Sequence, residues 1–165
     1  MHYIEAVNDL KNAPRPWVFM AGGITNCVDW QQELRGLLER VTDGTLINPR
    51  RADFPIGDPD AAAEQIEWEH RALWNSDVVS MWFDCGSIQP ICMFELGAHL
   101  SRFKLSSPPL SKMVIGVHPD YERKQDVHIQ TELIVDSMLS PAIELVSSLE
   151  EQADVIEQYV NELVD

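Results

Sequence analysis

The sequence predicts an α/β fold, a doubly wound sheet of five mostly parallel strands. Two observations lead to this prediction. Short apolar runs alternate along the whole chain with longer segments whose apolar residues recur at helical spacing. Glycine or proline follows the first two apolar runs, as expected where a strand gives way to a turn. Strands that alternate with helices pair in parallel through right-handed crossovers, so the helices cover the faces of one sheet.

The predicted strands are short, and apolar residues dominate them. They cover residues 17–21, 44–49, 77–83, 112–117 and 142–146. The first ends at Gly22-Gly23 and the second stops at Pro49, while the third is the longest of the five and has the composition of a buried strand. The flavodoxin-like strand order 2-1-3-4-5 is the natural arrangement for this alternation.

The predicted helices follow the strands and carry apolar residues three or four positions apart. They cover residues 29–41, 61–75, 91–103, 127–139 and 148–164. Ser148 with Glu151 three positions later has the pattern of a capping box at the start of the last helix. Residues 50–60 and 105–109 are predicted loops. We expect one domain over residues 1–165, with its core over about 16–147 and a C-terminal helix over 148–164.

The net charge excludes several classes of partner. The chain has 27 acidic and 12 basic residues, which gives a formal charge of −15 at pH 7. Such a chain is repelled by nucleic acid polymers and by anionic membranes, and no basic patch offsets this. No apolar stretch approaches the length of a membrane span, and the N-terminus does not resemble a signal peptide.

Neither a metal site nor a bound cofactor is expected. The histidines have no metal-binding spacing, and the three cysteines form no C-x-x-C pair. An odd number of thiols without metal spacing is typical of a reduced, cytoplasmic protein. Gly22-Gly23 does not begin a G-x-G-x-x-G or Walker pattern, so neither a dinucleotide nor a P-loop site is predicted.

Glu95 is the first candidate for a chemical role. It lies inside the apolar run from Pro90 to Leu100, just after the buried strand 77–83. An acid at this junction lies at the carboxyl edge of the sheet, where open α/β folds bind their ligands. The alternative is a first-turn acid that the helix dipole stabilises.

Glu69 is the acid that we pair with Glu95. A nucleophilic carboxylate must be ionised, and a second carboxyl group can then handle the proton. Glu69 lies late in the second predicted helix, eight residues before Asp77. The charged and polar residues around it also fit a simple solvated helix face.

Two further segments are candidate binding elements. The loop Ala21-Gly22-Gly23 can let a ligand approach the backbone, although it also fits an ordinary strand-to-helix turn. Arg50 and Arg51 end the second predicted strand. Their guanidinium groups suit a phosphate or carboxylate, and salt bridges to nearby acids are an equal alternative.

Five segments carry a resemblance through their order and spacing: Phe19-Met20-Ala21-Gly22-Gly23-Ile24, Asn48-Pro49-Arg50-Arg51, Gln65-Ile66-Glu67-Trp68-Glu69, Asp77-Val78-Val79-Ser80-Met81-Trp82-Phe83 and Phe94-Glu95-Leu96-Gly97. From about Trp17 to Gln130 the chain resembles the nucleoside 2-deoxyribosyltransferase-like family. This resemblance implies a flavodoxin-like fold and cleavage of the N-glycosidic bond of a deoxynucleoside or its monophosphate. It also implies that Glu95 is a nucleophile that forms a glycosyl-enzyme, that Glu69 serves the leaving base, and that Ala21-Gly22-Gly23 lines the sugar pocket.

The sequence departs from the well-known transferases at two positions. Phe19 stands where they have a tyrosine that holds the nucleophile, and Gln89 stands where they have a carboxylate that binds the sugar. In the family a neighbouring subunit often completes the pocket. That implies a homodimer or larger assembly, and it makes Asp126, His128 and Gln130 candidate substrate-binding residues. A lone histidine such as His128 is more often structural.

Three functions remain open at this point. The leading hypothesis is an enzyme, a transferase or hydrolase that works through a covalent intermediate on Glu95. The second is a non-catalytic sensor that binds a nucleotide or related sugar, which the departures at Phe19 and Gln89 favour. The third is a structural or interaction protein that uses the same fold.

Overall fold

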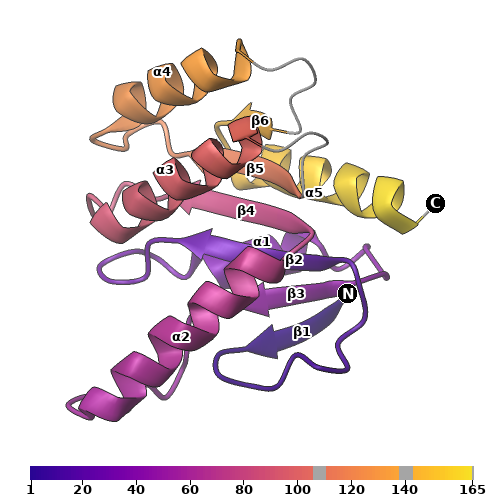
Figure 1. The fold of residues 1–165 in the computed structure, drawn as a ribbon, viewed down its shortest axis with the longest axis vertical. Helices are drawn as coiled ribbons and strands as arrows, with labels where there is room; N and C mark the ends of the chain where they lie inside the picture. Colours follow the sequence, from indigo (N-terminus) through magenta and orange to yellow (C-terminus); the bar gives the residue numbers. More distant parts are fainter. Residues whose placement is uncertain (106–110, 138–142, 165) are drawn as a thin grey trace.

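The computed structural model is built around one parallel sheet of six strands, in the order β1-β3-β2-β4-β5-β6 (Figure 1). It describes residues 1–105, 111–137 and 143–164. The strands are β1 (His2–Glu5), β2 (Trp17–Gly22), β3 (Thr45–Asn48), β4 (Val78–Phe83), β5 (Lys112–Val117) and β6 (Ile143–Val146). The last five strands have the predicted order 2-1-3-4-5, so the doubly wound α/β fold is confirmed.

The predicted number of five strands was wrong, because the described sheet has a sixth strand, β1, at its edge. β1 pairs in parallel with β3, with Tyr3 opposite Leu46, and the Ala6 N–H donates to the Asn48 carbonyl oxygen at 2.9 Å. All four residues of β1 are at least partly exposed. An edge strand buries little apolar surface, so the four-residue segment lacks the continuous apolar run by which the other strands were identified.

In the described part of the chain, five helices form two layers over the sheet (Figure 1). They are α1 (Trp30–Leu37), α2 (Pro59–Asn75), α3 (Pro90–Leu105), α4 (Lys124–Val135) and α5 (Leu149–Val164). One apolar core lies between the sheet and α2, α3 and α4, and a second lies between the sheet and α1 and α5. β4 is buried at all six positions and separates the two cores.

The helix starts agree with their sequence signals. The Asp58 side chain caps α2, which begins with a proline at its first turn. Ser148 Oγ accepts a hydrogen bond from the Glu151 N–H at 3.1 Å, as the capping pattern predicted. The Glu151 carboxylate accepts from the Ser147 N–H instead, at 2.8 Å, so the box closes one residue earlier than its usual form.

Some predicted bounds differ from those observed. α4 begins three residues before the predicted start at Val127, while the end predicted at residue 139 lies outside the described residues. Most of the loop predicted over 105–109 also lies outside them. Within the described part of the chain, no helix combines the length and the apolar character that a bilayer span requires.

Candidate active site

Glu69 and Glu95 line the same cavity, which has a volume of about 380 Å³. The cavity lies between α2, which carries Glu69, and α3, which carries Glu95. The two acids are the only carboxylates among its lining residues. The other residues that line it are Ile66, His70, Leu73, Trp74, Ile91, Phe94, Ala98 and His99. The structure therefore brings the two predicted acids together in a mainly apolar environment.

Glu69 is held in place by the turn of helix that precedes it. Gln65 lies one turn earlier on α2, and its Nε2 donates to Glu69 Oε1 at 2.7 Å. The same Nε2 donates to the Pro49 carbonyl oxygen at 3.0 Å. Because Pro49 directly follows β3, this pair of hydrogen bonds ties the Glu69 side chain to the end of a strand.

Burial makes both acids harder to ionise. It raises the pKa of Glu95 to about 7, and the nearby charge of Glu69 adds to this rise. Burial also raises the pKa of Glu69, although the hydrogen bond from Gln65 opposes the effect. Two interacting acids of this kind lose their protons in sequence, so the pair holds one proton over a range of pH. One group that can accept a proton thus lies beside one that can donate it.

The two histidines that line this cavity, His70 and His99, were not predicted as site residues. His99 is buried one helical turn after Glu95, and burial lowers its pKa to about 4, with smaller contributions from Arg102 and His70. Its ring packs on Trp74 with 5.0 Å between ring centroids. His99 is therefore neutral at pH 7. The four-residue spacing from Glu95 was the available signal, because residues four apart share a face of a helix.

Protein side chains occupy the space beside Gly22 and Gly23. Gly22 has φ +152°, and a Cβ there would collide with the Trp82 carbonyl oxygen and the Trp30 ring. A Cβ at Gly23 would collide with the Gln89 side chain. Ala21 is buried in the core. In this structure the paired glycines permit close packing of the chain on itself, which agrees with the alternative of a strand-to-helix turn.

Gln89 is buried and joins two loops at the carboxyl edge of the sheet. Its Oε1 accepts from the Gly23 N–H at 2.9 Å, and its Nε2 donates to the Asp84 carbonyl oxygen at 2.6 Å. It does not line the cavity that holds the two acids. Phe19, the other departure from the transferases, is buried in the core of the α2 face.

Arg50 and Arg51 have different surroundings. The Arg50 guanidinium donates to the carbonyl oxygens of Ile24, Cys27 and Val28 at 2.8 to 3.1 Å. It also forms an ion pair with Asp29 at 3.0 Å. Arg50 thus holds the loop after β2. Arg51 forms no salt bridge with any described residue, and its buried Nη1 has no hydrogen-bond partner among them.

Asp126, His128 and Gln130 lie on α4, away from the paired acids. Asp126 and Gln130 are exposed, and Asp126 is 3.7 Å from Arg123 in an ion pair. His128 lines a different cavity, whose other residues lie at the end of β6, at Ser147 directly after it, and on α5. Within one chain, these three residues do not complete the cavity of Glu69 and Glu95.

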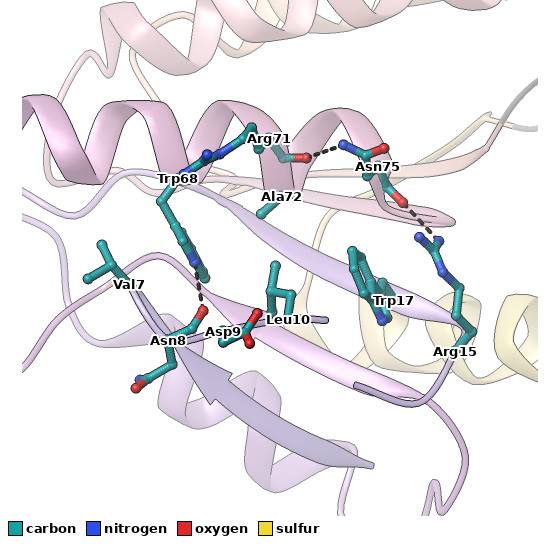
Figure 2. A pocket seen from close by; sticks show the side chains of 10 residues that line it. All are labelled: Val7, Asn8, Asp9, Leu10, Arg15, Trp17, Trp68, Arg71, Ala72 and Asn75. Atoms are coloured by element: carbon teal, nitrogen blue, oxygen red, sulfur yellow. Dashed lines mark hydrogen bonds between the residues drawn. The ribbon is translucent and has the colours of Figure 1, made fainter. Parts of the chain in front are cut away.

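Trp68 lies beside a third cavity, of about 470 Å³, between α2 and the segment that follows β1 (Figure 2). Its Nε1 donates to the Asn8 carbonyl oxygen at 2.8 Å. Trp17, on the other side of this cavity, donates to the Ala13 carbonyl oxygen at 3.1 Å, and Leu10 lies between the two rings (Figure 2). Both indole groups are already satisfied, so Trp68 holds the N-terminal segment on α2 and forms no wall for the acids.

A family model described as nucleoside 2-deoxyribosyltransferase like matches residues 15–121, which is more than half of the chain. The chain belongs to the nucleoside 2-deoxyribosyltransferase-like family. The match includes both acids and both arginines, and it ends before Asp126. No curated protein matches the chain. Among the described residues, no group of three or more histidine, cysteine or acidic side chains is placed to hold a metal ion.

Proposed function

We propose that the protein breaks or transfers the N-glycosidic bond of a nucleoside or nucleoside monophosphate through a covalent intermediate on Glu95. The observation that carries this proposal is the pair of acids in one cavity, each with a raised pKa. Membership of the nucleoside 2-deoxyribosyltransferase-like family supports the choice of a nucleoside as the substrate.

The reaction runs in two displacements. Glu95 attacks the anomeric carbon of the sugar, the bond between that carbon and the base nitrogen breaks, and its electrons leave with the base. Glu69 donates a proton to the departing base. A second base or a water molecule then attacks the same carbon, gives its proton to Glu69 and releases the Glu95 carboxylate.

The protonation states of the pair suit this sequence. Attack requires an ionised Glu95 and a protonated Glu69, which is one of the two arrangements of a singly protonated pair. In the free protein the Gln65 hydrogen bond favours charge on Glu69, so the proton is mainly on Glu95. A base bound beside Glu69 takes the place of the Gln65 amide as the hydrogen-bond partner of Glu69. Its acceptor nitrogen favours a protonated Glu69, so the proton moves from Glu95 to Glu69.

The apolar lining has two consequences for the reaction. It surrounds the acids with nonpolar groups, which strengthens their interaction with a developing positive charge on the sugar. It also provides flat aromatic surface, through Trp74 and Phe94, against which a base can pack. The protein acts as a transferase where a second base reaches the glycosyl-enzyme before water does, and as a hydrolase where water arrives first.

A non-catalytic nucleotide-binding protein is the second candidate function. Gln89 favours it, because its amide is already occupied by two loops and offers no carboxylate to the sugar. The buried Phe19 favours it as well, since it has no hydroxyl group that could hold Glu95. This function predicts thermal stabilisation by a nucleoside without release of base.

The decisive experiment incubates the protein with deoxynucleosides and with their monophosphates, each with and without a free acceptor base. Chromatography then measures released and exchanged bases. We expect release or exchange by the native protein, none by Glu95→Gln, and native rates for Glu67→Gln, which changes an exposed acid on the same helix as Glu69. Intact-mass measurement should also detect a glycosyl adduct on the native protein. If no substrate yields free or exchanged base, the enzymatic function is wrong.

We also propose that the protein works in the cytoplasm as a homodimer or larger assembly. The mouth of the cavity is surrounded by exposed apolar side chains, with Ile66 66%, Ile91 68% and Phe94 76% exposed. A second copy that covers this surface would bury them and would exclude water from the two acids. Light scattering after size exclusion tests the assembly, and Phe94→Glu should shift it toward monomer.

A further inference from the structure

A hydrogen bond from Tyr121 joins the segment after β5 to the segment before α3. The Tyr121 hydroxyl group donates to the Ile88 carbonyl oxygen at 2.6 Å. Tyr121 is 3% exposed and belongs to the apolar core on the α2, α3 and α4 face. Ile88 lies two residues before α3 begins, and α3 carries Glu95. The contact therefore connects a buried ring to the helix of the proposed nucleophile.

Tyr121 is itself fixed by its backbone and by its ring. Its N–H donates to the His118 carbonyl oxygen at 2.9 Å, and its own carbonyl oxygen accepts from the Lys124 N–H at 3.1 Å. Its ring packs on Phe83, the last residue of β4, with 5.3 Å between the ring centroids. Burial raises the pKa of Tyr121 to about 12, so the phenol keeps its proton at neutral pH and remains a donor.

The start of α3 receives little support from side-chain burial. Ile88, Pro90 and Ile91 are all exposed. The helix begins at Pro90, and its first backbone hydrogen bond runs from the Met93 N–H to the Gln89 carbonyl oxygen at 3.2 Å. A segment with few buried apolar contacts moves easily unless polar contacts hold it. The hydrogen bonds to residues 88 and 89 are therefore the main constraint on the first turn of α3.

These hydrogen bonds tie three connections of the sheet together. Gln89 binds the Gly23 N–H in the loop after β2 and the Asp84 carbonyl oxygen in the loop after β4. Tyr121 binds the neighbouring Ile88 from the segment after β5. All three connections follow the carboxyl ends of their strands, where folds of this class place their sites. They meet at the two residues that precede α3.

The direction of the Glu95 side chain depends on the position of this first turn. Glu95 lies five residues after Pro90, in the second turn of the same helix. Attack on a sugar carbon requires the reacting atoms to be about 3 to 3.5 Å apart and aligned, and a small displacement is costly. A shift of the helix start would carry Glu95 with it.

We propose that Tyr121 is a positioning residue, which fixes the first turn of α3 through Ile88 and so aligns Glu95 with the substrate. This inference rests on the proposed reaction at Glu95. Tyr121 is not among the residues that line the cavity of the two acids, so it acts through α3 and not by contact with the substrate. Alignment of the nucleophile matters most in the transition state, so the effect should fall on kcat more than on KM.

Tyr121→Phe tests this role, because it keeps the ring and removes only the donor. We expect kcat for release or exchange of base to fall about tenfold, and KM to change less than about twofold. Tyr159→Phe is the matched control. Tyr159 is also buried, but it lies on α5 in the other apolar core, so its variant should keep the native kcat. Both variants are assayed well below their melting temperatures, where lower stability alone leaves kcat unchanged.

A second measurement does not depend on turnover. Carbon-13 NMR of side-chain carboxyl groups follows the titration of Glu95, whose signal Glu95→Gln identifies by its loss. Burial raises the pKa of Glu95 to about 7, and Glu69, His70 and His99 are the other titratable residues that line its cavity. If the helix start shifts in Tyr121→Phe, water reaches Glu95, and its pKa should fall toward 4.5 by about half a unit or more. Tyr159→Phe should leave it unchanged.

Together the two measurements separate this inference from the proposed function. A native protein without turnover, combined with a lowered pKa of Glu95 in Tyr121→Phe, would reject the reaction and still support control of Glu95 by Tyr121. An active native protein, combined with an unchanged kcat and an unchanged pKa of Glu95 in Tyr121→Phe, would overturn the positioning role. The hydrogen bond to Ile88 would then only stabilise the fold.

Discussion

Gln89 joins the loop after β2 to the loop after β4, because its Oε1 accepts a hydrogen bond from the Gly23 N–H at 2.9 Å. Its Nε2 completes the bridge by donating to the Asp84 carbonyl oxygen at 2.6 Å. The backbone of Gln89 has φ +54°, a left-handed conformation that few side chains adopt without support. Gln89 therefore acts as a connector at the carboxyl edge of the sheet.

Gln89→Glu should lower the stability of the protein. The new carboxylate can still accept from Gly23, but it has no N–H for the Asp84 carbonyl oxygen and repels it instead. We expect a loss of about 1 to 3 kcal/mol in the free energy of unfolding at pH 8, the usual result of an unsatisfied buried polar group. Chemical denaturation measures it. Gln125→Glu, on the exposed start of α4, should leave stability unchanged. Equal stability of Gln89→Glu and native protein would contradict the bridging role.

Glu95→Gln should stabilise the protein at high pH while it removes activity. The folded pKa of Glu95 is raised from 4.5 to about 7, so the folded state holds the proton more tightly than the unfolded state. The stability that the folded state gains from this tighter proton binding is fully present below pH 4.5 and is lost as the pH rises through 7. Glutamine stays neutral at both pH values. The free energy of unfolding of the variant should therefore exceed that of the native protein by at most about 3 kcal/mol at pH 8, and the two should be equal at pH 4. Thermal unfolding at both pH values measures this.

The matched control for this effect is Glu67→Gln, because Glu67 is exposed on α2. Its stability relative to the native protein should not change between pH 4 and pH 8. A Glu95→Gln variant that is less stable than the native protein at pH 8 would show that Glu95 is held by partners in its ionised form.

The fold was predictable because its central strands and helices bury continuous apolar surface. β4 is buried at every position, and its apolar run identified it at once. β1 was missed because an edge strand of four partly exposed residues carries no such signal. Its pairing with β3 depends on backbone hydrogen bonds, which sequence composition does not report.

The candidate site was predictable only in part. Glu95 stood out as an acid in an apolar run, and the structure places it with Glu69 in one cavity. The roles of Arg50 and Gln89 were not predictable, because Arg50 donates to the Ile24 carbonyl oxygen and Gln89 accepts from the Gly23 N–H, both in a loop distant in the sequence. A side chain that binds distant backbone leaves no pattern in spacing or composition.

Gln65→Leu should move the rising limb of the pH profile of catalysis to higher pH. The proposed reaction needs one proton on the pair, so kcat/KM of the native protein should rise as the first acid ionises and fall as the pH passes about 7, where Glu95 loses its proton. Gln65 favours charge on Glu69, and its loss raises the pKa of Glu69 further. The first ionisation of the pair then occurs at higher pH, and the rising limb of kcat/KM follows it. An unchanged rising limb in this variant would mean that the two acids do not share a proton.

His99→Phe should stabilise the protein in mild acid. Burial lowers the folded pKa of His99 from 6.5 to about 4, so the folded state resists protonation. The contribution of the neutral ring is present above pH 6.5 and is lost as the pH falls toward 4. Phenylalanine keeps the packing on Trp74, and neither ring nitrogen has a hydrogen bond to lose among the described residues. Relative to the native protein, the free energy of unfolding of His99→Phe should be about 2 kcal/mol more favourable at pH 5 than at pH 8.

Denaturation curves at pH 5 and pH 8 test this expectation, with His2→Gln as the control. His2 is exposed on β1, so its substitution should shift both curves equally or not at all. If His99→Phe loses stability at pH 5 as well as at pH 8, the histidine ring makes a favourable contact that the apolar ring cannot replace.

Arg50→Met and Arg51→Met should separate a structural arginine from one that binds phosphate. Arg50 is occupied by three carbonyl oxygens and by Asp29, so its loss should lower the melting temperature and reduce turnover of nucleosides and monophosphates alike.

Arg51 has a buried Nη1 without a partner among the described residues. A phosphate is a suitable partner, because the guanidinium group binds it through paired hydrogen bonds. Arg51→Met should therefore raise KM for monophosphates about tenfold or more, the result of a lost charged hydrogen bond, and leave nucleosides unaffected. Steady-state kinetics on matched substrate pairs measure the difference, and equal losses on both substrates in Arg51→Met would exclude Arg51 as a phosphate ligand.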